Sequence, residues 1–454
     1  MVLQTQEPIL AAYTSKKVNI QTFGCQMNEY DTDKMMEVLR QENYIYTDDC
    51  KEADLIIVNT CSVREKAEQK VYSLLGRLRP LKERNPDLII GVGGCVAQQE
   101  GTRILNRAHS VDLVFGTDNL FDLPGMLEEV HRGNRIVQTE RKAHKQKVRN
   151  FIPDFAFENT SKPGLKSYIA ITKGCNNFCS FCIVPTTRGL EVSRKPENIM
   201  EEAVALVAQG AKELCLLGQN VNSYKAGGVD FVELLVRLNE IEGLERIRFT
   251  SPHPKDFHEQ LAEAIENLEH VCEHLHLPLQ AGSDSVLDRM KRNYTLQEYL
   301  EKVEMLRRRL PQVAISTDII VGFPGESDVD FERTVKAVET IRFDQIYAFK
   351  YSPRPGTPAV DYDGQLEESV KSDRLNRLLA LQEKIVAQKH QQLMGEVLEV
   401  LVEGTYPRDI RSRSGRSRGH YPVVILNSDA NIGDLVTVRI TGTKKYSLEA
   451  LSLQ

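Results

Sequence analysis

Apolar runs typical of strands alternate with helix-like stretches over most of this 454-residue chain. Between about residues 155 and 385 there are six such runs: SYIAIT, ELCLLG, RIRFTS, HLHLPLQ, AISTDIIVGF and QIYAFKYS. Helical stretches such as ENIMEEAVALVAQ follow most of them, and repeated strand–helix units build a parallel sheet that curls toward a barrel. Because a complete barrel of this kind has eight units, six units predict a (β/α)6 partial barrel that is open on one side.

The regions on either side of the predicted barrel have different patterns. Residues 16–132 alternate strand-like VNIQTFG, DLIIVNT and DLIIGVGG with helix-like segments, which favours a Rossmann-like α/β domain with a mostly parallel sheet. Residues 386–454 hold short alternating segments separated by turns rich in Gly, Asn and Asp, which is typical of a small all-β barrel. We therefore predict a multidomain α/β chain with domains at 16–132, 155–385 and 386–454. The basic stretch RKAHKQKVRN at 141–150 is interpreted as a solvated linker or as a segment that touches phosphate.

Composition and charge narrow the class of protein. The formal net charge is −6, so an anionic partner has to be met by a local basic patch. We find no apolar run of about 18 residues and no signal-peptide pattern, so we expect no membrane span and a cytosolic location. The nine cysteines are an odd number, and in a reducing compartment they are better interpreted as thiolates for metal binding or catalysis than as disulfides.

Three of the cysteines, Cys175, Cys179 and Cys182, lie within eight residues directly after the SYIAIT strand. Ligands of parallel α/β folds bind at the carboxyl ends of strands, where this loop is expected. A structural zinc site takes four protein ligands, and no fourth Cys or His is nearby in the sequence. Three thiolates on a four-iron cluster leave one iron open to an external ligand. A zinc knuckle completed by a distant residue is the alternative.

A second group of cysteines follows the strands of the first domain. Cys25, Cys61 and Cys95 each end an apolar run and precede a helix-like stretch. In one parallel sheet all three thiols would meet at the carboxyl edge, which again predicts an iron–sulfur cluster with an open iron. The alternative is that each is a small buried side chain. We assign no role to Cys50, Cys215 or Cys272.

Polar residues and one glycine at other strand ends complete the candidate binding face. They are Gln219, Asn220, Ser251 and Gly322, with His253, Gln280 and Ser283 at equivalent positions. Gly322 is expected to allow close approach of a nucleoside to the backbone. An ordinary structural role in the loops is the alternative for each.

Five arginines in the last domain form the main basic patch. They lie within eleven residues and are separated mostly by serine and glycine, so we expect them on a mobile loop of the β barrel: Arg408, Arg411, Arg413, Arg416 and Arg418. Arginine binds phosphate bidentately, and a small barrel with a basic loop suits single-stranded RNA. Arg411, Arg413, Arg416 and Arg418 are the predicted RNA-binding residues, and a solvated loop is the alternative.

The motifs together resemble the radical methylthiotransferases over nearly the whole chain. The spacing of CNNFCSFC is that of the radical S-adenosylmethionine (SAM) superfamily, in which the open iron chelates SAM and a 5′-deoxyadenosyl radical is made. TFGCQMNEYDTDKM, NTCSVREKAEQK and GGCVAQ resemble the family's first domain, LPLQAGSDSVLDRMKRNYT and TDIIVGFPGES its radical barrel, and GRSRGHYPVV its TRAM domain. Phe181 matches the aromatic residue that packs near the adenine of SAM.

The resemblance implies a function, cofactors and partners. GCQMN and LLGQNVN are most similar to the tRNA-modifying subfamily, which implies methylthiolation of carbon 2 of N6-isopentenyladenosine at position 37 in the anticodon loop. It implies two [4Fe–4S] clusters, SAM, and an electron donor such as flavodoxin or ferredoxin, and we expect a monomer. Another modified adenosine or a ribosomal-protein side chain is the alternative target. A non-catalytic metal-binding module that grips RNA is the alternative of another class.

Overall fold

The computed structural model describes residues 15–62, 67–141, 151–152 and 164–453, and it divides into two compact units, 1–142 and 143–454. The basic stretch interpreted as a linker lies outside the described residues from 142 onward. No helix in the described part of the chain is long and apolar enough to cross a membrane.

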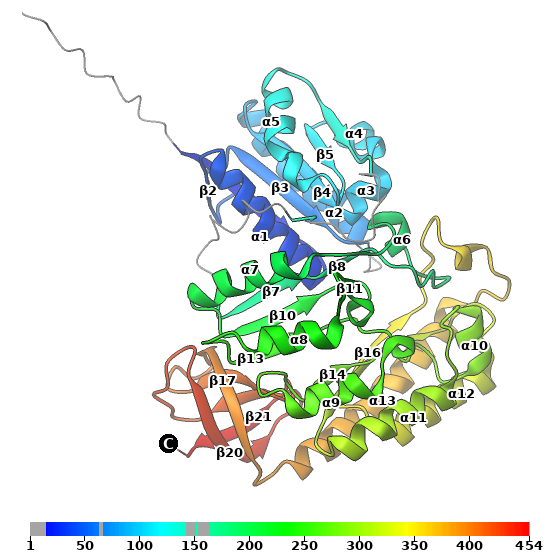
Figure 1. The fold of residues 1–454 in the computed structure, drawn as a ribbon. Helices are drawn as coiled ribbons and strands as arrows, with labels where there is room; N and C mark the ends of the chain where they lie inside the picture. The colour runs from blue at the N-terminus through cyan, green and yellow to red at the C-terminus, as the bar shows by residue number, and fades with distance from the viewer. Residues whose placement is uncertain (1–14, 63–66, 142–150, 153–163, 454) are drawn as a thin grey trace, which may run out of the picture. The chain divides into compact units, whose positions relative to one another are not determined.

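Unit 1 is built on a six-stranded parallel sheet (Figure 1). In spatial order the strands are β2 (Tyr44–Tyr46), β1 (Lys16–Thr22), β3 (Leu55–Thr60), β4 (Ile89–Gly94), β5 (Leu113–Phe115) and β6 (Ile136–Gln138). The helices are α1 (Gln26–Gln41), α2 (Ala67–Arg84), α3 (Cys95–Glu100), α4 (Thr102–Arg107) and α5 (Leu123–His131). The predicted Rossmann-like α/β domain is confirmed.

Both faces of this sheet are buried, which explains why its strands are apolar throughout. In β3, Leu55 and Ile57 belong to a core with residues of α1 and α5, whereas Ile56 and Val58 belong to a second core with residues of α2 and α4. Helices therefore cover the sheet on both sides, and an uninterrupted run such as LIIVNT is required.

Unit 2 begins with the predicted partial barrel, made of two three-stranded parallel sheets. The first has the order β13 (Arg246–Phe249), β10 (Glu213–Leu217), β7 (Lys166–Ala170), and the second has the order β14 (His274–His276), β15 (Ala314–Val321), β16 (Gln345–Lys350). A single parallel bridge between Ile247 and Val271 joins them. The six strands lie in chain order, and both edge strands, β7 and β16, remain unpaired on their outer side in the described sheets. The open (β/α)6 barrel is confirmed.

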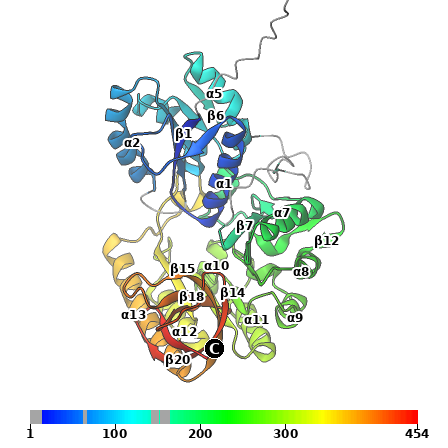
Figure 2. The ribbon, with the colours of Figure 1, turned by 90° about the vertical axis from the view of Figure 1, so that its left-hand side faces the viewer.

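Helices pack on the outer side of the six strands and share one continuous core with them (Figure 2). They are α7 (Pro196–Ala208), α8 (Phe231–Asn239), α9 (Glu259–Asn267), α10 (Asp284–Arg289), α11 (Leu296–Arg309), α12 (Asp328–Ile341) and α13 (Glu368–Gln392). Short elements decorate the strand ends: α6 (Val184–Thr187), and the two-stranded pairs β8 (Thr172–Lys173) with β9 (Val192–Ser193) and β11 (Lys225–Ala226) with β12 (Val229–Asp230). The predicted boundary at 385/386 falls inside α13, because this helix continues to Gln392.

The chain ends in a closed five-stranded barrel, as predicted, but one strand was missed. Its strands are β17 (Val397–Thr405), β18 (Arg413–Ser417), β19 (Pro422–Ile425), β21 (Leu448–Ser452) and β20 (Leu435–Thr443). The expectation that the arginine-rich segment is a mobile loop is wrong for Arg413 and Arg416, which lie in β18 between β17 and β19. Gly415 makes this possible, because a side chain there would collide with the Leu401 carbonyl oxygen on β17.

Candidate functional site: two groups of cysteines

The first cysteine group is a loop, residues 175–182, which follows β7 and the short β8 in unit 2. Ser180 anchors the loop to the segment after α10: its N–H donates to the Met290 carbonyl at 3.1 Å and its hydroxyl to the Arg289 carbonyl at 2.7 Å. Cys175 and Cys179 are buried and Cys182 is partly exposed. The loop is therefore held at the carboxyl end of the strands, where the sequence placed it.

A glycine and one predicted residue shape the start of the loop. Gly174 has φ +81°, and a Cβ there would collide with the carbonyl oxygens of Gly189 and Leu190. The Gly174 N–H donates to the Gln219 side-chain oxygen at 2.5 Å. Gln219, which was predicted to bind cofactor, is thus tied to the cysteine loop through the backbone.

The environment of the thiols favours their protonated form unless a cation joins them. Burial raises the pKa of Cys175, and burial together with the neighbouring Cys179 raises that of Cys182 to about 12. The other thiols of the triplet add to the rise of both pKa values, so the three cysteines lie near one another. Among the described residues, no three His, Cys, Asp or Glu side chains are arranged to hold a single metal ion. The triplet therefore shows neither a fourth ligand nor a preformed single-ion zinc site.

Arg292 is a buried cation beside the triplet that the sequence analysis did not single out. Its guanidinium donates to the Cys179 sulfur at 3.3 Å, to the Tyr294 hydroxyl at 3.1 Å and to the Pro278 carbonyl at 3.4 Å. The nearby phenol and thiol raise the pKa of Arg292 against the effect of its burial, so it stays charged. Arg292 therefore places a fixed positive charge and a hydrogen-bond donor beside the Cys179 sulfur.

Two buried polar atoms near this loop have no hydrogen-bond partner within the described structure: Asn220 Oδ1 and His253 Nε2. The Asn220 amide nitrogen donates to Asp256 at 2.8 Å, and His253 Nδ1 accepts the Lys255 N–H at 3.2 Å. Burial and nearby cations, Arg292 first, lower the pKa of His253 to about 2, so the ring is neutral and Nε2 carries the proton. One acceptor and one donor are therefore left for a polar ligand, since buried polar atoms without partners are rare.

Three other predicted residues are placed less directly. Phe181 packs edge-on against Phe323, with ring centroids 6.4 Å apart, at the end of β15. Ser251 has φ +60°, and its carbonyl accepts the Val221 N–H at 3.2 Å. Gly322 has φ +72°, and the space for its Cβ is filled by the Lys371 side chain, so packing against α13 explains this glycine. Binding of cofactor by these three residues stays a prediction.

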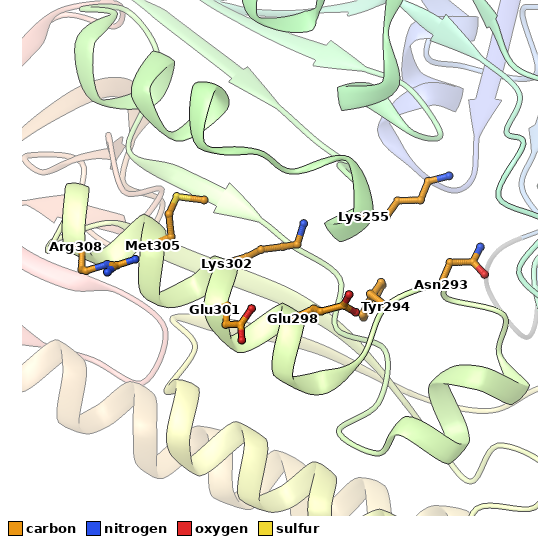
Figure 3. A pocket seen from close by; sticks show the side chains of 8 residues that line it. All are labelled: Lys255, Asn293, Tyr294, Glu298, Glu301, Lys302, Met305 and Arg308. Atoms are coloured by element: carbon orange, nitrogen blue, oxygen red, sulfur yellow. The ribbon is translucent and has the colours of Figure 1, made fainter.

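A surface groove of about 540 Å³ lies along α11, next to the Arg292 and His253 network (Figure 3). It is lined by Lys255, Asn293, Tyr294, Glu298, Glu301, Lys302, Met305 and Arg308. Tyr294 connects it to the loop, because the same ring contacts Arg292 and packs edge-on against His253. Its lining mixes acidic and basic side chains, so its charge favours no single class of ligand.

The second cysteine group lies in unit 1, where three neighbouring strands end. Cys25 follows β1 and precedes α1, Cys61 follows β3, and Cys95 follows β4 and begins α3. Because β1, β3 and β4 are adjacent and parallel, the three residues lie along one edge of the sheet. A Cβ on Gly24 would lie 2.9 Å from the Cys61 sulfur, which shows how closely the segment before Cys25 approaches Cys61. Gly24 thus lies against Cys61, and convergence of the three thiols at the carboxyl edge stays a prediction.

Buried amides and a threonine hold these strand ends in place. Asn28 Nδ2 donates to Asn59 Oδ1 at 3.1 Å and to the Thr60 carbonyl at 2.8 Å, and its Oδ1 lies 3.4 Å from the Cys25 thiol. The Thr60 hydroxyl accepts the N–H of Val96 at 3.2 Å. Cys25 is also the N-cap residue of α1, at the positive end of the helix dipole.

The arginines of the last domain divide into two sets. Arg418 is paired with Glu273 at 2.7 Å and donates to the Val271 carbonyl at 2.8 Å, and Arg416 donates to the His420 carbonyl at 3.3 Å. Their segment also meets the partial barrel, because Arg248 donates to the Ser417 and Arg418 carbonyls, both at 2.8 Å. The Arg418 side chain is therefore already bound to the partial barrel through Glu273 and the Val271 carbonyl.

Arg411 and Arg413 form the other set. The Arg411 side chain is 78% exposed and lies 3.4 Å from Asp409, while Arg413 donates to the Ala430 carbonyl at 2.7 Å. Arg411 is therefore the most available of the four for phosphate.

Comparison with known proteins agrees with this architecture. Residues 17–116 match the family described as uncharacterized protein family UPF0004, residues 169–338 the radical SAM superfamily, and residues 391–451 the TRAM domain. The chain is 44% identical over 436 residues to the tRNA-2-methylthio-N(6)-dimethylallyladenosine synthase of Thermoanaerobacter pseudethanolicus, with 95% of this chain and 91% of the relative covered. This chain belongs to that synthase family. A synthase of the same name from Desulfosudis oleivorans is 48% identical, with 86% of this chain and 83% of the relative covered.

Solved structures support the same fold for this member of the synthase family. The radical SAM methyltransferase TsrM from Kitasatospora setae, with tryptophan substrate and a SAM analogue bound, gives a TM-score of 0.57 at 17% identity and covers 76% of this chain and 75% of its own. The cobalamin-dependent radical SAM enzyme OxsB gives 0.52 at 12% identity, with 82% and 56% covered. At these identities the likeness concerns the fold alone.

Membership of the radical SAM superfamily implies SAM and a [4Fe–4S] cluster. The residues present fit both groups. Three thiols on one short loop, with no fourth ligand beside them in the described part of the chain, suit a cluster with an open iron. The unused acceptor of Asn220 and donor of His253 suit a polar ligand such as SAM beside it.

Proposed function

We propose that this chain is a tRNA methylthiotransferase that places a methylthio group on carbon 2 of N6-isopentenyladenosine at position 37. The observation that carries the proposal is the anchored three-cysteine loop with Arg292 on Cys179, in a chain 44% identical over 95% of its length to a synthase named for this product. Carbon 2 of adenine carries no leaving group and no acidic proton, so acid–base catalysis alone cannot address it.

Two cysteine groups take separate roles in this proposal. Cys175, Cys179 and Cys182 hold the cluster that binds SAM, and together these groups supply radical chemistry. Cys25, Cys61 and Cys95 hold a second [4Fe–4S] cluster associated with the sulfur that is transferred. Support for the second cluster is the alignment of the three cysteines at the ends of adjacent parallel strands.

The chain's own side chains hold and orient these groups. Ser180 fixes the loop, Arg292 compensates the negative charge on Cys179, and Gln219 fixes the backbone at Gly174. Asn220 and His253 offer the acceptor and donor that a bound SAM would satisfy, with Phe181, Ser251 and Gly322 as further predicted contacts.

The substrate is proposed to be a tRNA anticodon stem-loop. An unpaired loop base costs little to turn out of its stack, and arginines can hold the adjoining phosphates. Arg411 and Arg413 are the better candidates for holding phosphate, because Arg418 is paired with Glu273. Contact of Arg416 and Arg418 with RNA stays a prediction from the sequence. A flavodoxin- or ferredoxin-type donor, a monomeric state and a cytoplasmic location complete the proposal.

The test is anaerobic reconstitution followed by reaction with tRNA that carries isopentenyladenosine. Nucleoside mass spectrometry should show 2-methylthio-N6-isopentenyladenosine and two equivalents of SAM consumed. In cells that lack the protein, the same nucleoside should disappear. An unchanged level in those cells, or product only on another nucleoside or on a ribosomal protein, would contradict the proposal.

A further inference from the structure

The sheet β14–β15–β16 has one face turned away from its helices, and this inner face is unusually polar and aromatic. Alternate residues, such as Leu275, Ile315, Ile319 and Ile346, belong to the core shared with the helices. The inner face carries the other alternates, which are His274, His276, Ser316, Asp318, Tyr347 and Phe349 together with Ala314, Ile320 and Gln345. A face that only needed to fill a barrel would carry branched apolar residues.

The polar residues of the inner face form one hydrogen-bonded chain. His274 Nε2 lies 3.1 Å from the Ser316 hydroxyl, which lies 3.0 Å from His276 Nδ1, and His276 Nε2 lies 3.4 Å from Asp318 Oδ2. If His276 Nε2–H donates to the carboxylate, His276 Nδ1 accepts from the Ser316 hydroxyl, and this hydroxyl accepts from His274 Nε2–H. Every hydrogen bond of the chain then has one donor and one acceptor. The chain orients Asp318 and leaves its second oxygen as an acceptor on a side chain that is 32% exposed.

The aromatic residues of the inner face are exposed. Tyr347 is 47% exposed and Phe349 is 49% exposed, although both lie in a strand of the partial barrel. They stand two residues apart on β16, so their rings project from the same side, and Tyr347 packs edge-on against His276 with centroids 5.9 Å apart. Exposed rings beside a fixed acceptor are typical of a ligand site.

The small barrel covers one end of this face, and the cysteine loop lies at the other end of the same strands. His420 of the small barrel stacks on His274, with centroids 5.0 Å apart, at the amino end of the strands. At the carboxyl end of the strands, in the core shared with the helices, Phe323 packs against Phe181 of the loop and against Tyr351, with ring centroids 6.4 and 5.2 Å apart. A ligand on the inner face would therefore be reached from the side where radical chemistry is supplied.

We propose that the inner face of β14–β16 is the pocket for the prenylated adenine, and that it selects for the prenyl group. Tyr347 and Phe349 contact the base and its dimethylallyl substituent, and Asp318 accepts the remaining N–H of the exocyclic nitrogen. The inference rests on the proposed function and adds the residues that choose the substrate. The chemistry matches, because this base offers a flat ring, a branched apolar chain and one donor next to it.

The first test compares two anticodon stem-loops that differ only in the prenyl group. Phe349→Ala and Tyr347→Ala should each lower kcat/KM on the prenylated stem-loop about 10- to 100-fold, as expected for loss of a base–aromatic contact. The ratio of prenylated to unprenylated kcat/KM should fall, because the lost contact serves the prenyl group. Asp318→Ala should lower kcat/KM on both, since both carry an exocyclic N–H. The matched control is Val329→Ala, whose side chain is 62% exposed on α12, and which should leave the ratio unchanged.

The second test does not depend on turnover. Hydroxyl-radical footprinting should label Tyr347 and Phe349 in the free protein and show protection when the prenylated stem-loop is added. Protection without RNA would mean that the chain itself covers this face, and would overturn the pocket. An unchanged prenyl preference in both aromatic variants would overturn it as well. Failure of the unsubstituted protein to methylthiolate the prenylated stem-loop would instead contradict the proposed function.

Discussion

The two cysteine groups reach similar arrangements by different routes. In unit 2 the three thiols are close in sequence. Ser180 anchors the loop that carries them, and Arg292 donates a hydrogen bond to Cys179. In unit 1 the thiols are 36 and 34 residues apart, and the order of the strands brings them to one edge. The first group therefore depends on a local loop and one distant cation, whereas the second depends on the whole sheet and on a helix start.

This difference predicts which perturbations affect one group and spare the other. A change of loop or counter-charge should act on the Cys175 group alone. A change at a strand end should act on the Cys25 group alone.

The largest effect should come from removing one thiol from each group. Cys25→Ala and Cys179→Ala should each abolish methylthiolation and each lose about half of the bound iron, as expected for one of two four-iron clusters. Only Cys179→Ala should abolish cleavage of SAM, measured as 5′-deoxyadenosine by mass spectrometry. Loss of cleavage in Cys25→Ala, with iron still at the other group, would contradict the division of roles.

The next effect should come from the buried cation. Arg292→Met removes a charge-assisted hydrogen bond to Cys179, a contact worth about 1.5–3 kcal/mol, so formation of 5′-deoxyadenosine should fall about 10- to 100-fold. The midpoint potential of this cluster, measured by an EPR-monitored titration, should become more negative because a positive charge is lost. Arg292→Lys should restore part of the shift. A parallel shift in the second cluster would show that the two groups are not independent.

Stability should respond to two glycines, one in each region. Gly24→Ala and Gly174→Ala force a side chain onto backbones with φ +133° and +81° and into occupied space, at a cost of about 1–3 kcal/mol each. Calorimetry should show unfolding at a lower temperature, and iron should be lost only from the group next to the substitution. Gly76→Ala is the control, because nothing lies within 4 Å of its Cβ in α2 and it should be neutral or stabilising. Equal iron loss from both groups in either variant would contradict the prediction.

The sequence predicted those parts of the molecule that follow from local patterns. Apolar runs placed all six strands of the partial barrel, and the position of each cysteine after such a run predicted both groups. Strand β18 was missed because RSGRS has no apolar alternation. It is a strand because β17 and β19 pair with it on both sides.

Contacts between residues far apart in sequence could not be predicted in this way. Arg292 meets Cys179 across 113 positions, and its segment looked like an ordinary basic turn. Arg246 and Arg248 lie in a strand but are buried, because the carbonyls of β18 and the residue after it accept their hydrogen bonds. Which arginines are left for RNA is therefore decided by how the small barrel packs, and composition does not contain that information.

The smallest effect should be a difference in acid sensitivity between the two units. Burial lowers the pKa of His253, His274, His390 and His420 in unit 2, and nearby cations add to the effect at all of these but His390. In unit 1 only the pKa of His131 is lowered among the described histidines. In the unfolded chain a histidine has a pKa near 6.5 and takes up a proton at a pH where the same histidine in folded unit 2 stays neutral. The contribution to folding stability is therefore fully present above about pH 6.5 and declines as the pH falls. His253, His274 and His420, whose pKa values are lowered most, should each cost about 1 kcal/mol of stability between pH 6.5 and 5.5. Hydrogen exchange at decreasing pH should therefore open unit 2 before unit 1, and His253→Asn should reduce the slope. Earlier opening of unit 1 would mean that its sheet carries an acid-sensitive group that these histidines do not account for.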